Sequence, residues 1–79
     1  MMVTVRLFSH LVKYLPPEAK HDTWTTALET DMCAGDLLTR LGFPPDIPRA
    51  ITVNDENHKE DVVLQEGDVL KVFPVAMGG

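Results

Sequence analysis

The last two residues of the chain, Gly78 and Gly79, are the ones whose types and position suggest chemistry. A C-terminal carboxylate has a pKa of about 3.3–3.7, so it is anionic at neutral pH and a poor electrophile until it is activated. Glycines carry no side chain, so this backbone can enter a narrow channel. Extended, residues 75–79 reach about 16–18 Å. The Gly79 carboxyl group is a candidate reacting group, and a frayed terminus is the structural alternative.

The remaining titratable side chains form no recognisable catalytic or metal-binding motif. Cys33 has no second cysteine and no basic neighbour that would favour a reactive thiol. The acidic residues at 60–61 and 66–68 sit at expected turns and indicate a solvated face rather than an acid–base pair. Gly67 stands alone, so the chain lacks a phosphate-binding loop. Three histidines are too far apart in the sequence to indicate a metal site: His10, His21 and His58. We therefore expect the chain itself to bind no metal, no ATP and no other cofactor.

Composition excludes several classes of protein. The 79 residues are enough for one domain, and the net charge of −5 argues against binding to nucleic acid or to anionic lipid. The first residues alternate apolar and polar types and do not resemble a signal peptide, and no run is long enough to cross a membrane. Because there is one cysteine, no disulfide forms within the chain. We expect a reduced, cytoplasmic protein.

Hydrophobic periodicity and turn residues divide the chain into elements that would position the C-terminus. Period-two alternation and β-branched residues predict strands at 2–8, 21–29, 49–54, 58–64 and 68–73. One helix is expected over 31–43, starting at Asp31 or Cys33 and ending at Gly42. Residues 9–19 read as a loop that can hold one helical turn, and Pro74 is expected to end pairing of the last strand. This β-β-α-β-β-β order predicts an α+β fold, with a domain over 1–74 and a flexible tail over 75–79.

The alternation also assigns side chains to the two faces of the sheet. The residues expected to face the helix are Val3, Val5, Leu7, Leu70 and Val72. Those expected on the opposite face, beside the exit of the tail, are Arg6, Phe8, Lys71 and Phe73. Aromatic and arginine side chains often anchor protein interfaces, so we expect this face to bind a partner.

The chain resembles the MoaD/ThiS family of sulfur carrier proteins over nearly its whole length. The resemblance rests on "VRLF" at the start, "DLLTRLG" in the helix, "ITVND", "LQEGDVLKVFP" and the terminal "GG". The molybdopterin-pathway members commonly end in "FPPV-x-GG", whereas this chain ends in "FPVAMGG". The residues that match this ending are Phe73, Pro74, Gly78 and Gly79, and those that depart from it are Val75, Ala76 and Met77. The likeness is therefore closer to MoaD, and the departures leave the pathway open.

The resemblance implies a ubiquitin-like β-grasp fold, with a mixed sheet of four to five strands packed on one helix. It also implies that Gly79 is adenylated by an E1-like adenylyltransferase of the MoeB/ThiF type, which uses ATP, and becomes a thiocarboxylate that donates sulfur. The chain would then be a carrier without an active site of its own. It would also be the small subunit of a molybdopterin synthase, with its tail in a MoaE-type large subunit. The residues expected to bind the partner are Arg6, Phe8, Lys71, Phe73, Pro74, Val75, Ala76 and Met77.

Three alternatives remain at the level of the sequence. The carrier could serve thiamin synthesis or another pathway. The activated tail could instead join a lysine of a target protein, which would make the chain a ubiquitin-like modifier. The third alternative is a β-grasp interaction module whose tail takes part in no reaction.

Overall fold

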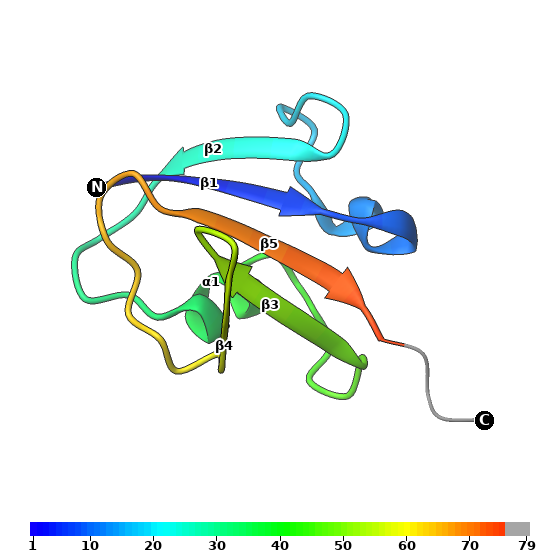
Figure 1. Cartoon of the computed structure of the whole chain (residues 1–79). Helices are drawn as coiled ribbons and strands as arrows, with labels where there is room; N and C mark the ends of the chain where they lie inside the picture. The colour runs from blue at the N-terminus through cyan, green and yellow to red at the C-terminus, as the bar shows by residue number, and fades with distance from the viewer. Residues whose placement is uncertain (76–79) are drawn as a thin grey trace.

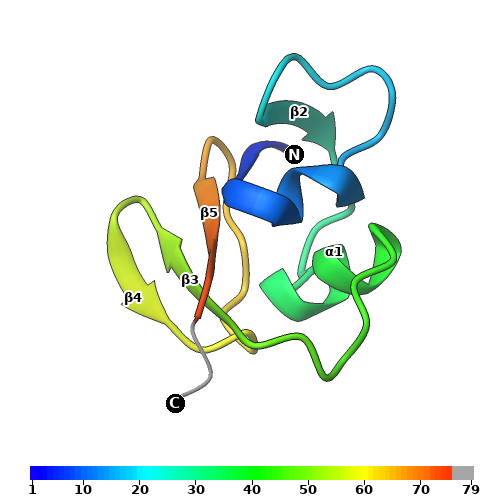
Figure 2. The ribbon, with the colours of Figure 1, turned by 90° about the vertical axis from the view of Figure 1, so that its right-hand side faces the viewer.

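The computed structural model describes residues 1–75, which form a five-stranded mixed sheet with strand order β2-β1-β5-β3-β4 (Figure 1). The elements are β1 (Met2–Leu7), the 3-10 helix η1 (Ser9–Tyr14), β2 (Thr23–Ala27), α1 (Ala34–Arg40), β3 (Arg49–Val53), β4 (Glu56–His58) and β5 (Val69–Pro74). Figure 2 shows α1 on one side of the sheet. The predicted α+β class and β-grasp arrangement are confirmed. The tail predictions for Ala76, Met77, Gly78 and Gly79 lie outside the described residues.

Strands β1 and β5 occupy the inner part of the sheet and pair in parallel. Their alternation follows the predicted faces, because the five residues expected to face the helix are all buried: Val3, Val5, Leu7, Leu70 and Val72. Leu37 and Leu38 of α1 and Leu11 of η1 complete this core from the same side. The hydrophobic pattern therefore directs one face of the sheet inward and leaves the other open.

The helix is shorter than the predicted 31–43. Asp31 has a φ of +66°, in the left-handed region, so the chain cannot be helical there. Cys33 is the N-cap residue, one of the two predicted starts, and its backbone N donates to Oδ2 of Asp36 at 3.5 Å. Gly42 has a φ of +87° and ends the helix as expected. Neither helix within residues 1–75 has the length and apolar character needed to cross a membrane.

The predicted fourth strand at 58–64 is wrong. Asn54 and Asp55 both have positive φ values, +52° and +69°, and reverse the chain in a two-residue turn. Strand β4 therefore pairs with β3 immediately, as Glu56–His58. The following residues run instead along the start of α1, where the backbone N of Ala34 donates to the carbonyl of Val62 at 3.0 Å.

Pro74 is the last residue of β5. Its missing N–H would face β1, which ends at Leu7, so no bond to a strand is lost there. On the other side Pro74 stands opposite Arg49 of β3, and the backbone N of Val75 donates to the carbonyl of Pro48 at 3.4 Å. The prediction that strand pairing ends at Pro74 is therefore confirmed, with one backbone hydrogen bond beyond it on the β3 side.

Candidate functional site

The parallel pairing of β1 and β5 brings their carboxyl ends together, close to residue 75, where the tail begins. Arg6 stands in register with Lys71, and the backbone N of Phe8 donates to the carbonyl of Val72 at 3.2 Å. Phe8 follows the last residue of β1, and Phe73 precedes the last residue of β5. Residues separated by more than 60 positions in the sequence thus share one open surface.

The two phenylalanine rings stack, with centroids 4.5 Å apart and ring planes at 17°. The guanidinium carbon of Arg6 lies 4.7 Å from the centroid of the Phe8 ring, a cation–π contact. We call Arg6, Phe8, Lys71 and Phe73 the Phe8 patch. The predicted neighbourhood of these four side chains is confirmed by this geometry, and their role in binding stays a prediction.

Both cations of the Phe8 patch have acidic partners that the sequence analysis did not identify. Nε of Arg6 donates to Oδ2 of Asp22 at 3.0 Å, and Nζ of Lys71 donates to Oδ1 of Asp55 at 2.8 Å. The hydrogen bond from Arg6, followed by one from the Thr23 hydroxyl, lowers the pKa of Asp22 below its usual value. The acids lie in turns next to the strands, and only the strand order shows which cation each one meets. The first pair holds Arg6, whose guanidinium lies over the Phe8 ring, and the second directs the Lys71 amine to the turn after β3.

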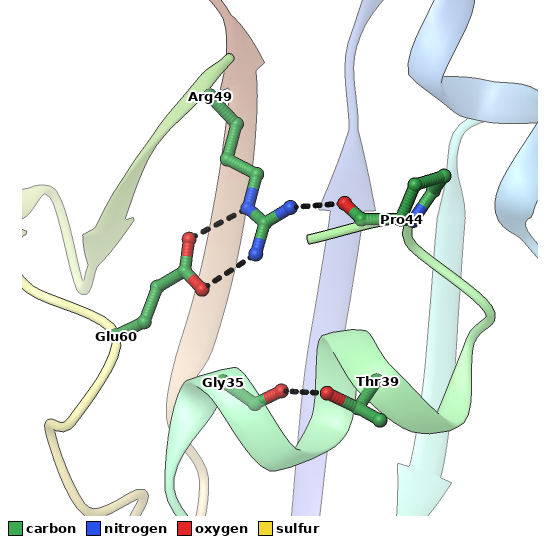
Figure 3. A network of polar contacts seen from close by, with 5 residues as sticks. All are labelled: Gly35, Thr39, Pro44, Arg49 and Glu60. Atoms are coloured by element: carbon green, nitrogen blue, oxygen red, sulfur yellow. Dashed lines mark hydrogen bonds and ion pairs between the residues drawn. The ribbon is translucent and has the colours of Figure 1, made fainter. Parts of the chain in front are cut away.

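An ion pair beside the root of the tail was also missed. Arg49, which stands opposite Pro74, donates from Nε and Nη2 to the two carboxylate oxygens of Glu60 at 2.7 and 2.8 Å (Figure 3). Its Nη1 donates to the carbonyl of Pro44 at 2.8 Å. The guanidinium also lies 5.7 Å from the centroid of the Phe43 ring. The Arg49 side chain therefore connects β3 to the loop that contains Pro44 and to the loop that contains Glu60. This connection lies next to the last residue of β5, which stands opposite Arg49.

This ion pair changes the titration of both partners. The hydrogen bonds from Arg49 lower the pKa of Glu60, and the same bonds raise the pKa of Arg49. The side chain of Arg49 is 12% exposed and that of Glu60 is 32% exposed, so the guanidinium is largely shielded from water and the carboxylate is partly shielded. The expectation that Glu60 belongs to a solvated acidic face is wrong.

Asp68 also departs from that expectation. It is 8% exposed, and its carboxylate accepts hydrogen bonds from Nδ2 of Asn54 at 2.9 Å and from the backbone N of Gln65 at 2.7 Å. It therefore connects the turn before β5 to the turn after β3. Within residues 1–75, no three His, Cys, Asp or Glu side chains lie close enough together to hold a metal ion.

The sheet order, the single α-helix and the core place the described residues in the class of ubiquitin-like β-grasp domains. Residues 1–78 match the family model described as Mut7-C ubiquitin, and the chain belongs to that family. The predicted likeness to the MoaD/ThiS group of ubiquitin-like proteins is confirmed. No curated protein matches the chain.

Solved structures share this fold. SAMP1 from Haloferax volcanii has 22% identity and a TM-score of 0.74, with 100% of both chains covered. A putative molybdopterin converting factor subunit 1 from Pyrococcus furiosus has 22% identity and a TM-score of 0.72, covering 95% of this chain and 98% of that chain. The structure of a complex of subunits 1 and 2 of the molybdopterin-converting factor from Helicobacter pylori contains a chain with 24% identity and a TM-score of 0.59. The match covers 100% of this chain and 100% of that chain.

Proposed function

We propose that this protein is a sulfur carrier whose Gly79 carboxyl group is the reacting group. The observation that carries the proposal is the position of Gly78 and Gly79, which follow the last strand of a ubiquitin-like domain after a short segment. The chain needs no catalytic side chains of its own, because the activating enzyme would supply the nucleotide and the catalytic groups. ATP would be a substrate of that enzyme and not a cofactor of this chain.

The reaction proceeds in two steps. The Gly79 carboxylate attacks the α-phosphorus of ATP, which forms an acyl-adenylate and releases pyrophosphate. A sulfur nucleophile then attacks the acyl carbon and AMP leaves, so the carboxyl group ends as a thiocarboxylate. The activation is needed because an anionic carboxylate is a poor electrophile, whereas AMP is a good leaving group.

The Phe8 patch is the proposed docking surface for an E1-like adenylyltransferase of the MoeB/ThiF type. Its stacked rings and Arg6 offer an apolar centre with a charged rim, which is the composition of many interface anchors. Phe73 lies one residue before Pro74, so an enzyme bound to the patch stands next to the root of the tail. Residues 75–79 would bridge the last gap, since five extended residues reach about 16–18 Å.

The acceptor of the sulfur is proposed to be a precursor of molybdopterin. This proposal is supported by the shared fold with molybdopterin converting factor subunit 1, one example of which is solved in complex with subunit 2. A MoaE-type large subunit would then be a second partner. The chain would complete a synthase by inserting its tail into the active site of that subunit.

A second candidate function is attachment to other proteins. Two of the similar structures, both from Haloferax volcanii, are of a small archaeal modifier protein. In this case a lysine amine of the target, rather than a sulfur nucleophile, would attack the activated Gly79. The two functions share the first step and differ only in the second.

The test is the intact mass of the protein after incubation with ATP, a candidate E1-like enzyme and a sulfide source. The sulfur carrier gains the mass that corresponds to the replacement of one oxygen by sulfur. A variant that lacks Gly79 is the control and is expected to show no gain. A protein modifier would instead appear as a covalent conjugate to a second chain, through an isopeptide bond.

The absence of any mass change with an enzyme that activates another carrier would contradict both functions. It would favour the third alternative from the sequence, an interaction module whose tail takes part in no reaction. Such a module would retain its partner binding when Gly78 and Gly79 are deleted.

A further inference from the structure

The outer edge of β2 has no neighbouring strand. β2 is the end strand of the sheet, and within residues 1–75 the one bridge across its outer edge joins Thr23 to Lys20 (Figure 1). The opposite end strand, β4, has three residues and carries Glu56 and His58, and short or charged edge strands discourage further pairing. β2, with the sequence TWTTA, is longer, carries no charge and consists mainly of residues that favour strands.

Hydrogen bonds at its two ends determine which backbone groups of β2 point outward. The backbone N of Leu7 donates to the carbonyl of Asp22 at 3.0 Å, and that of Leu28 donates to the carbonyl of Met1 at 2.7 Å. Asp22 and Leu28 therefore bond toward β1. Bonding toward a given neighbour recurs at every second residue of an antiparallel strand, so the odd-numbered residues of β2 point away from β1.

The contacts of Thr23 agree with this alternation. Its backbone N donates to the carbonyl of Lys20 at 3.0 Å, and its carbonyl accepts from the N of Lys20 at 2.9 Å, both across the outer edge. The next two outward-pointing residues are Thr25 and Ala27. No hydrogen bond within the described residues reaches their backbone from the outer side, so two donors and two acceptors face away from the sheet.

We propose that β2 pairs with β2 of a second copy of this chain, antiparallel, about a two-fold axis at Thr26. In this register Thr25 stands opposite Ala27 of the second copy, and Ala27 stands opposite Thr25 of the second copy. Each of these two pairs exchanges two hydrogen bonds, so the outward groups of both residues in both copies are satisfied. The two sheets become one continuous sheet.

The side chains are compatible with this register. Thr26 meets its own copy, and Thr–Thr pairs stabilise neighbouring strands. Trp24 would stand opposite Leu28 of the second copy, and no two like charges face each other. The backbone of Lys20 already occupies the outward groups of Thr23, so pairing between the copies stops before Thr23. β2 of the second copy ends close to this position, at its Ala27.

At the end of the paired region, an acidic side chain of one copy would lie near a basic side chain of the other. Glu29 follows β2 and forms an exposed ion pair with Arg40 of its own chain, and in the second copy its carboxylate would arrive beside Lys20. A hollow of about 420 Å³ lies at this place, lined by Glu18, Lys20, Thr23, Trp24 and Thr25. It leaves room for the residues that follow Ala27 in the second copy. The two-fold axis repeats this contact on the other side.

The dimer is weak and depends on concentration and salt. Two five-residue strands bury much less than the ~800 Å² per partner of a standard interface. Each copy also carries a net charge of −5, so the copies repel each other at low ionic strength. The dimer fraction is expected to increase with protein concentration and with added salt.

The test is sedimentation equilibrium over a range of concentrations with the variants Thr25→Pro and Thr25→Val. Both variants lose the side-chain hydroxyl that lies 3.2 Å from Oγ1 of Thr4, but only proline removes the outward N–H. The wild type and Thr25→Val are expected to dimerise equally. Thr25→Pro is expected to dimerise at least about tenfold more weakly, because a symmetric dimer loses two hydrogen bonds.

Circular dichroism checks that Thr25→Pro is folded, and Ala27→Pro is the second variant if it is not. A wild type that stays monomeric at the highest concentration and salt would overturn the proposal. Equal dimerisation of the proline and valine variants would overturn it as well. If the chain stays monomeric while an added extended peptide shifts the amide resonances of Thr25 and Ala27, the edge accepts a strand of another protein, and self-pairing is wrong.

Discussion

Phe8 and Phe73 illustrate how single residues acquire a shared role through strand pairing. Both side chains are half-buried. The strand alternation that directs Leu7 and Val72 into the core places the next residue of each, Phe8 and Phe73, on the open face. Their stacking at 4.5 Å depends on the parallel register of β1 and β5. The Phe8 patch is therefore a preformed surface, and a partner would lose little conformational entropy of these side chains on binding.

Replacing Phe8 and Phe73 together by Ser is expected to lower kcat/KM for adenylation of the chain by its cognate enzyme at least about tenfold. The reason is that truncation of an interface anchor typically costs more than about 1 kcal/mol. The measurement is pyrophosphate release against carrier concentration. Val63→Ser is the matched control, because Val63 is 44% exposed and lies outside the patch. An unchanged kcat/KM in the folded double variant would exclude the patch as the docking site.

The ionisation of Glu60 makes the stability of the fold depend on pH. Its pKa is lowered in the folded protein by the hydrogen bonds from Arg49. A lowered pKa means that the pair stabilises the fold above the ordinary glutamate value of 4.5, and that this contribution is lost as the pH falls through the folded pKa.

Glu60→Gln is therefore expected to reduce the free energy of unfolding by about 1–2 kcal/mol at neutral pH, between the values for exposed and buried pairs. The difference from the wild type should shrink toward zero below pH 4.5. Urea denaturation at several pH values measures it. Glu29→Gln, which removes an exposed partner of Arg40, should change stability by less than about 0.5 kcal/mol. A pH-independent effect of Glu60→Gln would contradict the assignment.

At the scale of elements, α1 shows how local signals define the end of a short helix. The backbone N of Gly42 donates to the carbonyl of Thr39 at 3.0 Å, and that of Phe43 donates to the carbonyl of Leu38 at 3.1 Å. These two bonds form a Schellman motif, which satisfies carbonyl groups that the helix leaves free. Gly42, with its φ of +87°, makes this arrangement possible, and Phe43 enters the core directly after it.

Gly42→Ala is expected to lower the free energy of unfolding by about 1–2 kcal/mol, because a side chain disfavours the left-handed backbone. An added Cβ would meet no atom within 4 Å, so the cost is one of backbone conformation and not of a clash. Thermal and urea denaturation both report it. Gly42→Asn should cost less, because asparagine tolerates this conformation better. Equal costs for the two variants would argue against this cause.

At the scale of the whole molecule, one small core stabilises the sheet and both helices. For 79 residues, the expected free energy of unfolding is about 4–12 kcal/mol. Leu70 of the inner strand β5 has an exposed fraction of 0% and lies in the same cluster as Leu11 and Leu37. The core is thus shared by elements from the whole chain, and its loss would affect all of them together.

Leu70→Ala is expected to cost about 2–5 kcal/mol, a large fraction of the total, because it leaves a cavity in a fully buried site. The neighbouring change Val69→Ala, on the open face of the same strand, should cost less than about 1 kcal/mol. Cooperative urea unfolding monitored at Trp24 measures both. Similar costs for the two variants would contradict the assignment of the faces.

Local sequence signals were enough to predict several elements of the fold. Period-two alternation identified β1, β5 and their buried faces, since burial of one face imposes that period on neighbouring residues. Gly42 marked the end of α1 and the start was narrowed to Asp31 or Cys33, of which the structure has Cys33, because capping depends on residues within one turn. The terminal diglycine and the motifs near it indicated the ubiquitin-like family.

Contacts between residues far apart in the sequence could not be predicted from local patterns. The ion pair of Arg49 with Glu60 and the burial of Asp68 depend on how separate segments pair, and no local pattern encodes that choice. The same holds for the outward groups of Thr25 and Ala27, which depend on the position of β2 at the end of the sheet. The physical reason is that hydrogen-bond partners and burial in a sheet are set by the strand order, to which the whole chain contributes.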